Sequence, residues 1–319
     1  MSAGRNRCVV VLGAGRSGTS AVTRGLAALG VDLGDRLRRG WGKNPTGFFE
    51  DRDLLALNRK LKRALGIRGD SLRLIAPTEW DAPEIRALHG QAVATLRRRF
   101  GDCALWGYKY GRTLRLLPFW EGVYEDLGLE VSYLAAIRNP LSVAASRARL
   151  DSRRGRQAVS DLEWLVNVVP YFARLRGRPL VAVDYDRLMA EPRAQLERIA
   201  DRLDLPADQA AIEAYRDGFL EAGRRHSRFT IDDLGGDLGE EGRVHPLVRD
   251  AYGWLHRLAG DDIEASDAGL WDDWARIARA VEAMAPALAQ ADRAEAERRR
   301  AQRGPRAALA WLRRKLRGG

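Results

Sequence analysis

The segment CVVVLGAGRSGTS at residues 8–20 constrains the fold of this chain more than any other. Its uninterrupted apolar run is typical of a buried strand, and three glycines interspersed with hydroxyl residues follow at the start of a helical pattern. A glycine-rich turn between a strand and a helix directs backbone N–H groups and the positive helix end toward one point, which suits a phosphate. We therefore predict that residues 8–20 bind a phosphate group of a nucleotide.

Other apolar runs predict the rest of a sheet. The runs Cys8–Leu12, Val131–Ile137 and Leu180–Val183, with a weaker one at Cys103–Tyr108, have few charges, as strands covered on both faces require. Helical patterns alternate with these runs at 17–29, 50–65, 81–100, 114–127, 140–150, 157–175 and 192–203. A capping-box-like pair, Asp81 and Glu84, marks the start of the third helix. This alternation predicts an α/β fold with crossover helices.

The strand signals stop after Pro206. Helical patterns continue at 246–258 and at 271–303, where Pro286 predicts a kink. Residues 306–317 form a short basic segment whose apolar stripe either packs on the protein or rests on an anionic membrane surface. We predict a nucleotide-binding domain at 1–260 and a helical C-terminal extension at 261–319.

The composition excludes several classes of protein. Apolar residues make up 45% and charged residues 30%, which is typical of a soluble globular chain. The charge-free stretch near the middle, 164–173, is far shorter than the roughly 20 residues of a transmembrane helix. Two cysteines form neither a disulfide framework nor a paired metal-ligand motif, which fits a reducing cytoplasm. The net charge of +11 is spread along the chain, so we expect anionic ligands but no nucleic acid.

The glycine loop matches two common nucleotide-binding patterns in part. Gly13, Gly15 and Gly18 fit G-x-G-x-x-G, but residues 31–35 are too short for the second strand that a dinucleotide-binding fold needs. Residues 13–20 nearly fit G-x-x-x-x-G-K-[ST], with threonine in place of the lysine. The run 180–184 ends in an aspartate, as a kinase would require. A P-loop kinase and a non-catalytic nucleotide-binding module therefore remain alternatives.

A third interpretation uses the cation inside the loop. In the segment Arg16-Ser17-Gly18-Thr19-Ser20, an arginine precedes two hydroxyls at the helix start. This segment resembles the 5′-phosphosulfate loop of sulfotransferases that use 3′-phosphoadenosine 5′-phosphosulfate (PAPS). Arg138 follows an apolar strand and Ser146 lies eight residues later, an arrangement that resembles the 3′-phosphate site of the same family.

Further segments resemble bacterial, carbohydrate-type members of this family. These segments are 44–51, 106–109 and 225–228, whereas residues 185–192 resemble the family's stretch around a tyrosine near the adenine. After Lys109, however, the chain continues with Tyr110-Gly111-Arg112, where such members often have Asp-Pro-Arg. The resemblance implies a three-layer P-loop-type fold with a mostly parallel central sheet and a helical C-terminal extension.

The resemblance also implies a donor and a binding role for each matching residue. PAPS would be the sulfuryl donor, and no metal would be required. Arg16 would lie near the bridging oxygen, and Arg138 and Ser146 would hold the 3′-phosphate. Tyr185 would lie near the adenine, and Arg225 would close over the nucleotide. The residues that would hold the 5′-phosphate are Ser17, Gly18, Thr19 and Ser20.

The catalytic base is the least constrained part of this hypothesis. Glu50 is our first candidate, with Asp51 and His226 as alternatives, although Glu50 and Asp51 could instead cap a helix. Lys109 would help to neutralise the transferring sulfuryl group. The acceptor would be a hydroxyl or amino group of a carbohydrate, glycolipid or small molecule. The enzyme would be cytoplasmic, with peripheral contact to the inner membrane surface through its basic tail.

Overall fold

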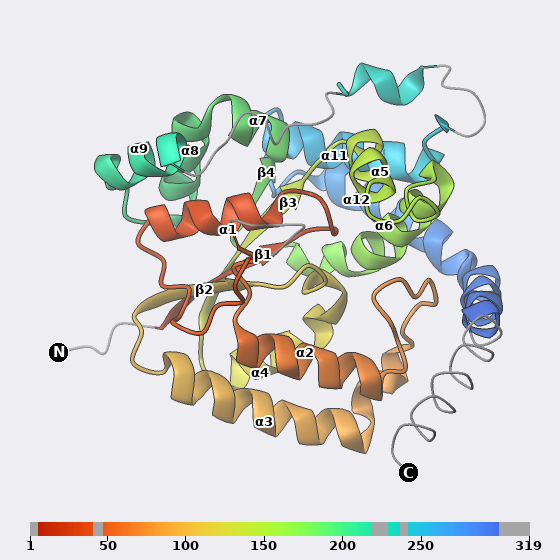
Figure 1. Cartoon of the computed structure of the whole chain (residues 1–319), viewed down its shortest axis with the longest axis horizontal. Coiled ribbons are helices and arrows are strands. Elements are labelled where there is room, and N and C mark those ends of the chain that lie inside the picture. Colours follow the sequence, from red (N-terminus) through yellow and green to blue (C-terminus); the bar gives the residue numbers. More distant parts are fainter. Residues whose placement is uncertain (1–5, 41–46, 219–228, 237–241, 300–319) are drawn as a thin grey trace, which may run out of the picture.

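A computed structural model describes residues 6–40, 47–218, 229–236 and 242–299 of the 319-residue chain (Figure 1). Within these residues, the centre is a four-stranded sheet in the order β2-β1-β3-β4. The strands are β1 (Arg7–Leu12), β2 (Leu105–Lys109), β3 (Glu130–Ile137) and β4 (Leu180–Asp184). Each neighbouring pair is parallel, so the carboxyl ends of the strands lie at one edge.

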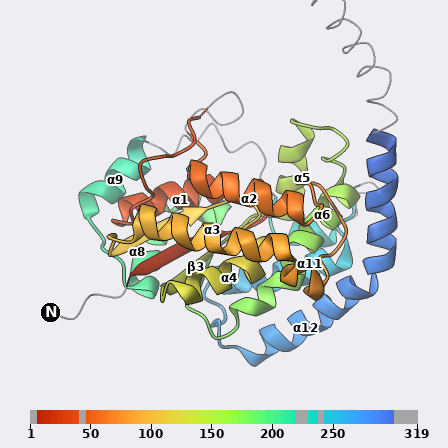
Figure 2. The same ribbon diagram turned by 90° about the horizontal axis from the view of Figure 1, so that it is seen from below.

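Helices cover both faces of the sheet (Figure 1, Figure 2). Val9 and Val11 of β1 face one apolar core, whereas Cys8 and Val10 face the other. The first core includes α1 (Thr19–Ala28), α7 (Tyr185–Ala190), α8 (Pro192–Leu203) and α9 (Gln209–Gly218). The second includes α2 (Arg52–Ala64), α3 (Pro83–Phe100), α4 (Leu117–Asp126), α6 (Gln157–Phe172), α11 (Pro246–Ala259) and α12 (Ala268–Ala283). The predicted three-layer α/β fold is confirmed.

The predicted strands agree closely with those observed. β1, β3 and β4 each differ from their apolar run by one residue, and β2 is displaced by at most two. The helix after β3 is α5 (Pro140–Ala148), close to the predicted 140–150. Two short helices, α7 and α9, were not predicted from the sequence.

The predicted capping box before α3 does not form. Ala82 is the N-cap residue, no side chain caps this helix, and Pro83 is its first residue. Proline disfavours the helical conformation for the residue before it, so the helix begins two residues later than expected. The side chain of Glu79 instead accepts a hydrogen bond from the Ala76 amide, 2.7 Å away, around the 3₁₀ turn at Pro77–Asp81.

The C-terminal helix is broken where a kink was predicted. α12 ends at Ala283, and a second helix occupies 285–299, with Pro286 in its first turn. Trp274 of α12 packs on Phe172 with ring centroids 4.4 Å apart, which joins α12 to the second core. The basic segment 306–317 lies outside the described residues. No helix in the described part of the chain is both long and apolar enough to cross a membrane.

Candidate functional site

The loop between β1 and α1 requires glycine at two positions. A Cβ atom on Gly13 would lie 2.6 Å from the Ala136 carbonyl oxygen of β3, and one on Gly18 would lie 2.2 Å from the Tyr185 ring. Both glycines have positive φ angles, 148° and 80°. Arg16 also has a φ of 80°, which is uncommon for a residue with a side chain. Backbone strain of this kind concentrates at ligand-binding loops.

The helix after this loop begins without a side-chain cap. Gly18 is the N-cap residue of α1, and the first turn contains no acidic residue. The first amides of a helix have no acceptor within the helix, and the helix dipole makes this end positive. The start of α1 can therefore bind an anion.

Arg16 reaches from the loop to α5. Its Nε donates a hydrogen bond to Ser146 Oγ at 3.0 Å, joining residues 130 positions apart in the sequence. Burial lowers the pKa of Arg16, and the positive charge of Arg138 lowers it further, while Tyr185 opposes the change. Arg16, Arg138, Ser146 and Tyr185 therefore belong to one site.

Arg138 follows the last residue of β3 and is 7% exposed. Its guanidinium carbon lies 4.5 Å from the centroid of the Tyr185 ring. Its Nε is buried and has no hydrogen-bond partner among the described residues. Within the same part of the chain, neither Arg16 nor Arg138 has an acidic side chain within ion-pair distance. Two guanidinium groups without a counter-charge favour a bound phosphate or sulfate.

A buried ion pair lies at the end of β2. Lys109 Nζ is 3.2 Å from Glu50 Oε1, and Arg38 Nη1 is 3.3 Å from Glu50 Oε2. Burial lowers the pKa of Lys109, Glu50 opposes this, and the charges of Arg38 and Arg16 lower the pKa further. The effect of Arg16 connects this ion pair electrostatically with the glycine loop. The Glu50 carboxylate, the Lys109 ammonium and Arg16 of the glycine loop thus lie in one region at the carboxyl edge of the sheet.

Asp51 has a structural position. Its Oδ1 accepts hydrogen bonds from the Asp53 and Leu54 amides at the start of α2, and its Oδ2 is 2.7 Å from Arg99 Nη2. The helix-capping alternative thus describes Asp51, whereas the Glu50 side chain points to Lys109 and Arg38. Of the two candidate bases that the structure describes, Glu50 is the one in contact with Lys109 and Arg38.

Two expected residues cannot be placed, and one participant was missed. Arg225 and His226 lie outside the described residues. Arg38 was not predicted as a site residue, although its guanidinium pairs with Glu50 and lies 4.0 Å from the Phe48 ring centroid. A cation ten residues before a phenylalanine pair has no recognisable spacing, so only the fold identifies it.

The alternative interpretations of the glycine loop find little support in the fold. Residue Asp32 makes a single bridge to Trp106 at the outer side of β2, so no second central strand follows α1. Asp184 Oδ1 accepts two amide hydrogens at the start of α7, and Tyr252 donates to its Oδ2 at 3.3 Å. Both oxygens that a kinase would use for a metal are therefore engaged. Among the described residues, no three His, Cys, Asp or Glu side chains form a metal-binding group.

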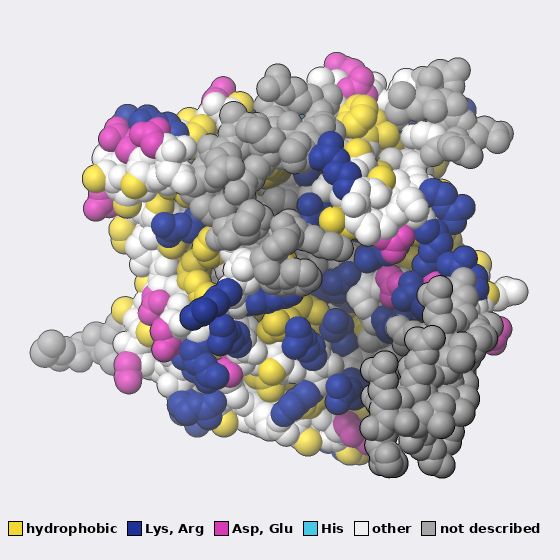
Figure 3. All heavy atoms as spheres, viewed as in Figure 1, with side chains coloured by type: hydrophobic (Ala, Val, Ile, Leu, Met, Phe, Trp, Pro, Cys, Tyr) yellow, Lys and Arg dark blue, Asp and Glu magenta, His cyan; other side chains and the backbone are white. Residues whose placement is uncertain are grey.

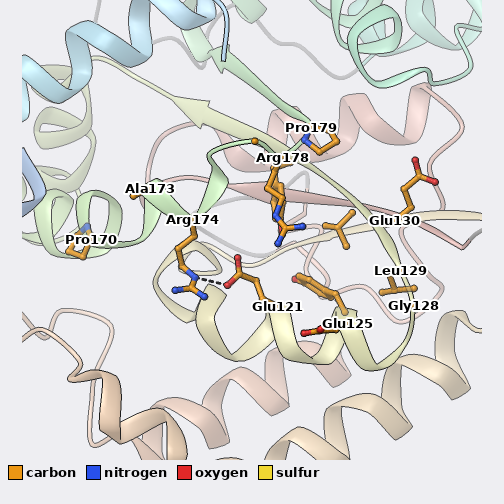
Figure 4. A pocket seen from close by; sticks show the side chains of 14 residues that line it. Glu121, Glu125, Gly128, Leu129, Glu130, Pro170, Ala173, Arg174, Arg178 and Pro179 are labelled. Atoms are coloured by element: carbon orange, nitrogen blue, oxygen red, sulfur yellow. Dashed lines mark hydrogen bonds and ion pairs between the residues drawn. The ribbon is translucent and has the colours of Figure 1, made fainter. Parts of the chain in front are cut away.

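A cavity of about 1280 Å³ opens at the opposite edge of the sheet (Figure 4). Glu130, which begins β3, and Pro179, which precedes β4, line it, and Arg174 pairs with Glu121 at 2.5 Å. Because all the strands are parallel, their first residues lie far from the glycine loop. This cavity is therefore separate from the candidate site.

The fold and the site together define an α/β protein with an anion-binding loop. No protein-family model matches the chain, and no curated protein matches its sequence. A sulfotransferase domain from the Synechococcus PCC 7002 olefin synthase is 18% identical, with 86% of this chain and 94% of that chain covered and a TM-score of 0.41. Sulfotransferase STF9 from Mycobacterium avium is 17% identical over 70% of each chain, also with a TM-score of 0.41. These likenesses are too weak to establish a family, so a functional assignment depends on the site itself.

Proposed function

We propose that this protein is a sulfotransferase that moves a sulfuryl group from PAPS to a hydroxyl or amino group. The observation that carries this proposal is the pair Arg16 and Arg138, which converge at the glycine loop without an acidic partner in the described part of the chain. A nucleotide with phosphates at both its 5′ and 3′ positions offers each guanidinium group an anion. ATP offers phosphates at one position only.

The residues present fit such a nucleotide. The buried Nε of Arg138 is a donor that a phosphate oxygen would satisfy, and the absence of a Cβ at Gly18 lets the Tyr185 ring lie directly against the glycine loop. In this proposal, Arg138 and Ser146 hold the 3′-phosphate, and Tyr185 lies near the adenine. The residues that hold the 5′-phosphate are Arg16, Ser17, Gly18, Thr19 and Ser20.

The ion pair at β2 supplies the remaining chemistry in this proposal. Bound PAPS would supply the sulfuryl group. Glu50 accepts the proton of the acceptor hydroxyl, while Lys109 stabilises negative charge on the group in transfer and Arg16 stabilises the departing phosphate. The acceptor that we propose is a carbohydrate, a glycolipid or another small molecule.

Calorimetric titration of adenosine 3′,5′-bisphosphate (PAP) tests the proposal. Arg138→Ala should weaken binding of this ligand by about 10- to 150-fold, because a charge-assisted hydrogen bond contributes about 1.5–3 kcal/mol. Adenosine 5′-phosphosulfate, which lacks the 3′-phosphate, should lose much less affinity. Arg149→Ala is the matched control, because Arg149 follows α5 and is exposed. Equal losses for both ligands would contradict the assignment of Arg138.

A further inference from the structure

Two arginines beyond the β2 ion pair have no role in the chemistry above. Arg112 lies three residues after Lys109, so their Cα atoms are at most about 11 Å apart. Its side chain is half-buried and has neither a hydrogen bond nor an ion pair among the described residues. Its guanidinium packs against Gly69, where a Cβ atom would lie 2.9 Å from Arg112 Nη2.

Arg68, next to Gly69, is the second of these arginines. Its Nε and Nη2 are shielded from solvent and make no hydrogen bond with the described residues, although Nε lies 3.4 Å from Asp70 Oδ1. Asp70 is shared, because Arg299 also pairs with it. Arg299 also pairs with Glu295, whereas Asp70 is the one acidic partner of Arg68 among the described residues, and Arg112 has none there.

Other cations lie close enough to Arg112 to interact with it electrostatically. Burial is the main cause of the lowered pKa of Arg147, about 10, and the charges of Arg154 and Arg112 lower it further against the opposing effect of Glu163. On the other side of Arg112, the Lys62 ammonium lies 5.6 Å from the Tyr110 ring centroid. Lys and Arg side chains gather on the face that carries α2 and the loop after it (Figure 3).

This cationic corner lies at the same edge of the sheet as the reacting groups. Residues 109–112 lead directly from the end of β2 to Arg112, and the loop after α2 lies at the carboxyl side of the strands in both views (Figure 1, Figure 2). We propose that the acceptor carries an anionic group, a sulfate, phosphate or carboxylate, which Arg112 and Arg68 bind while its reacting hydroxyl lies at Glu50 and Lys109. This inference rests on the proposed sulfotransferase function.

Inorganic sulfate is a direct probe of this subsite. With PAP present at saturation to fill the nucleotide site, and at constant ionic strength, we expect calorimetry to detect sulfate binding to the wild-type protein. Arg112→Gln and Arg68→Gln should each weaken this binding at least tenfold. Arg112→Lys, which keeps the charge, should retain most of it. Arg59→Gln is the matched control, because Arg59 is an exposed arginine of α2.

Equal sulfate affinity in the wild-type protein and in Arg112→Gln would overturn the inference. Because the Arg112 side chain has no described hydrogen bond to lose, its loss should leave the thermal midpoint nearly unchanged. If Arg112→Gln nevertheless fails to fold, the sulfate affinities of Arg68→Gln and the Arg59→Gln control are compared instead. Equal affinities of these two variants would overturn the inference. Failure of PAP to bind would instead contradict the proposed function. In that case, the sulfate affinities of the wild-type protein and Arg112→Gln, measured without PAP, would still test the role of Arg112.

Discussion

Replacing Asp161 by asparagine should remove a pH-dependent loss of stability. This α6 carboxylate is 1% exposed, and it accepts hydrogen bonds from the His245 amide at 2.8 Å and from Gln157 Nε2 at 2.7 Å. Burial raises the pKa of Asp161 from 3.8 to about 6, because desolvation outweighs these hydrogen bonds and the charge of Arg147.

The magnitude follows from this difference in pKa. Each unit corresponds to about 1.36 kcal/mol, so the shift corresponds to about 3 kcal/mol. Below about pH 3 the carboxyl group is protonated in the folded and unfolded states alike. As the pH rises, the unfolded state ionises first, and the folded state therefore becomes less stable by about 3 kcal/mol once the pH exceeds 6 to 7. Roughly two-thirds of this loss should fall between pH 4.5 and pH 7.5.

Urea unfolding at these two pH values measures the effect. The free energy of unfolding of Asp161→Asn, relative to the wild-type protein, should rise by about 2 kcal/mol from pH 4.5 to pH 7.5. Asparagine loses one acceptor, but that cost does not depend on pH. Asp201→Asn, an exposed carboxylate of α8, should follow the wild-type profile. Parallel profiles for the wild-type protein and Asp161→Asn would refute the reasoning.

Two further predictions concern the candidate site. Arg16→Ala and Glu50→Gln should each lower kcat at least 100-fold. Glu50→Gln should leave the calorimetric affinity for PAP nearly unchanged. Near-normal turnover of this variant would exclude Glu50 as the base. Gly18→Ala should destabilise the protein by at least about 1 kcal/mol more than Gly128→Ala, as urea unfolding would show. Both glycines have positive φ, but only at Gly18 would a Cβ atom meet the Tyr185 ring. Equal losses of unfolding free energy in the two variants would contradict this packing.

The sequence predicted the parts of the molecule whose signals are local. Runs such as Val131–Ile137 are apolar on both faces, and this property alone identifies a covered strand. The glycine loop between β1 and α1 has a short, spaced pattern of glycines and hydroxyls, whereas its predicted phosphate-binding role stays a prediction. Arg38 was not identified, because its pairing with Glu50 comes from the fold and not from a local sequence pattern. The start of α3 was placed wrongly because the conformational effect of Pro83 outweighed a capping pattern.

The strand order β2-β1-β3-β4 has a consequence for the growing polypeptide. The glycine loop leaves the ribosome early, but Arg138 and Ser146 are made more than 100 residues later, and β1 pairs with β3 only when that length is available. Residues 1–120 alone contain the loop without Arg138 and Ser146, the residues to which the proposed function assigns the 3′-phosphate. A bisphosphate nucleotide should therefore not stabilise nascent chains of that length, and it should act on folding only after β3 has joined the sheet.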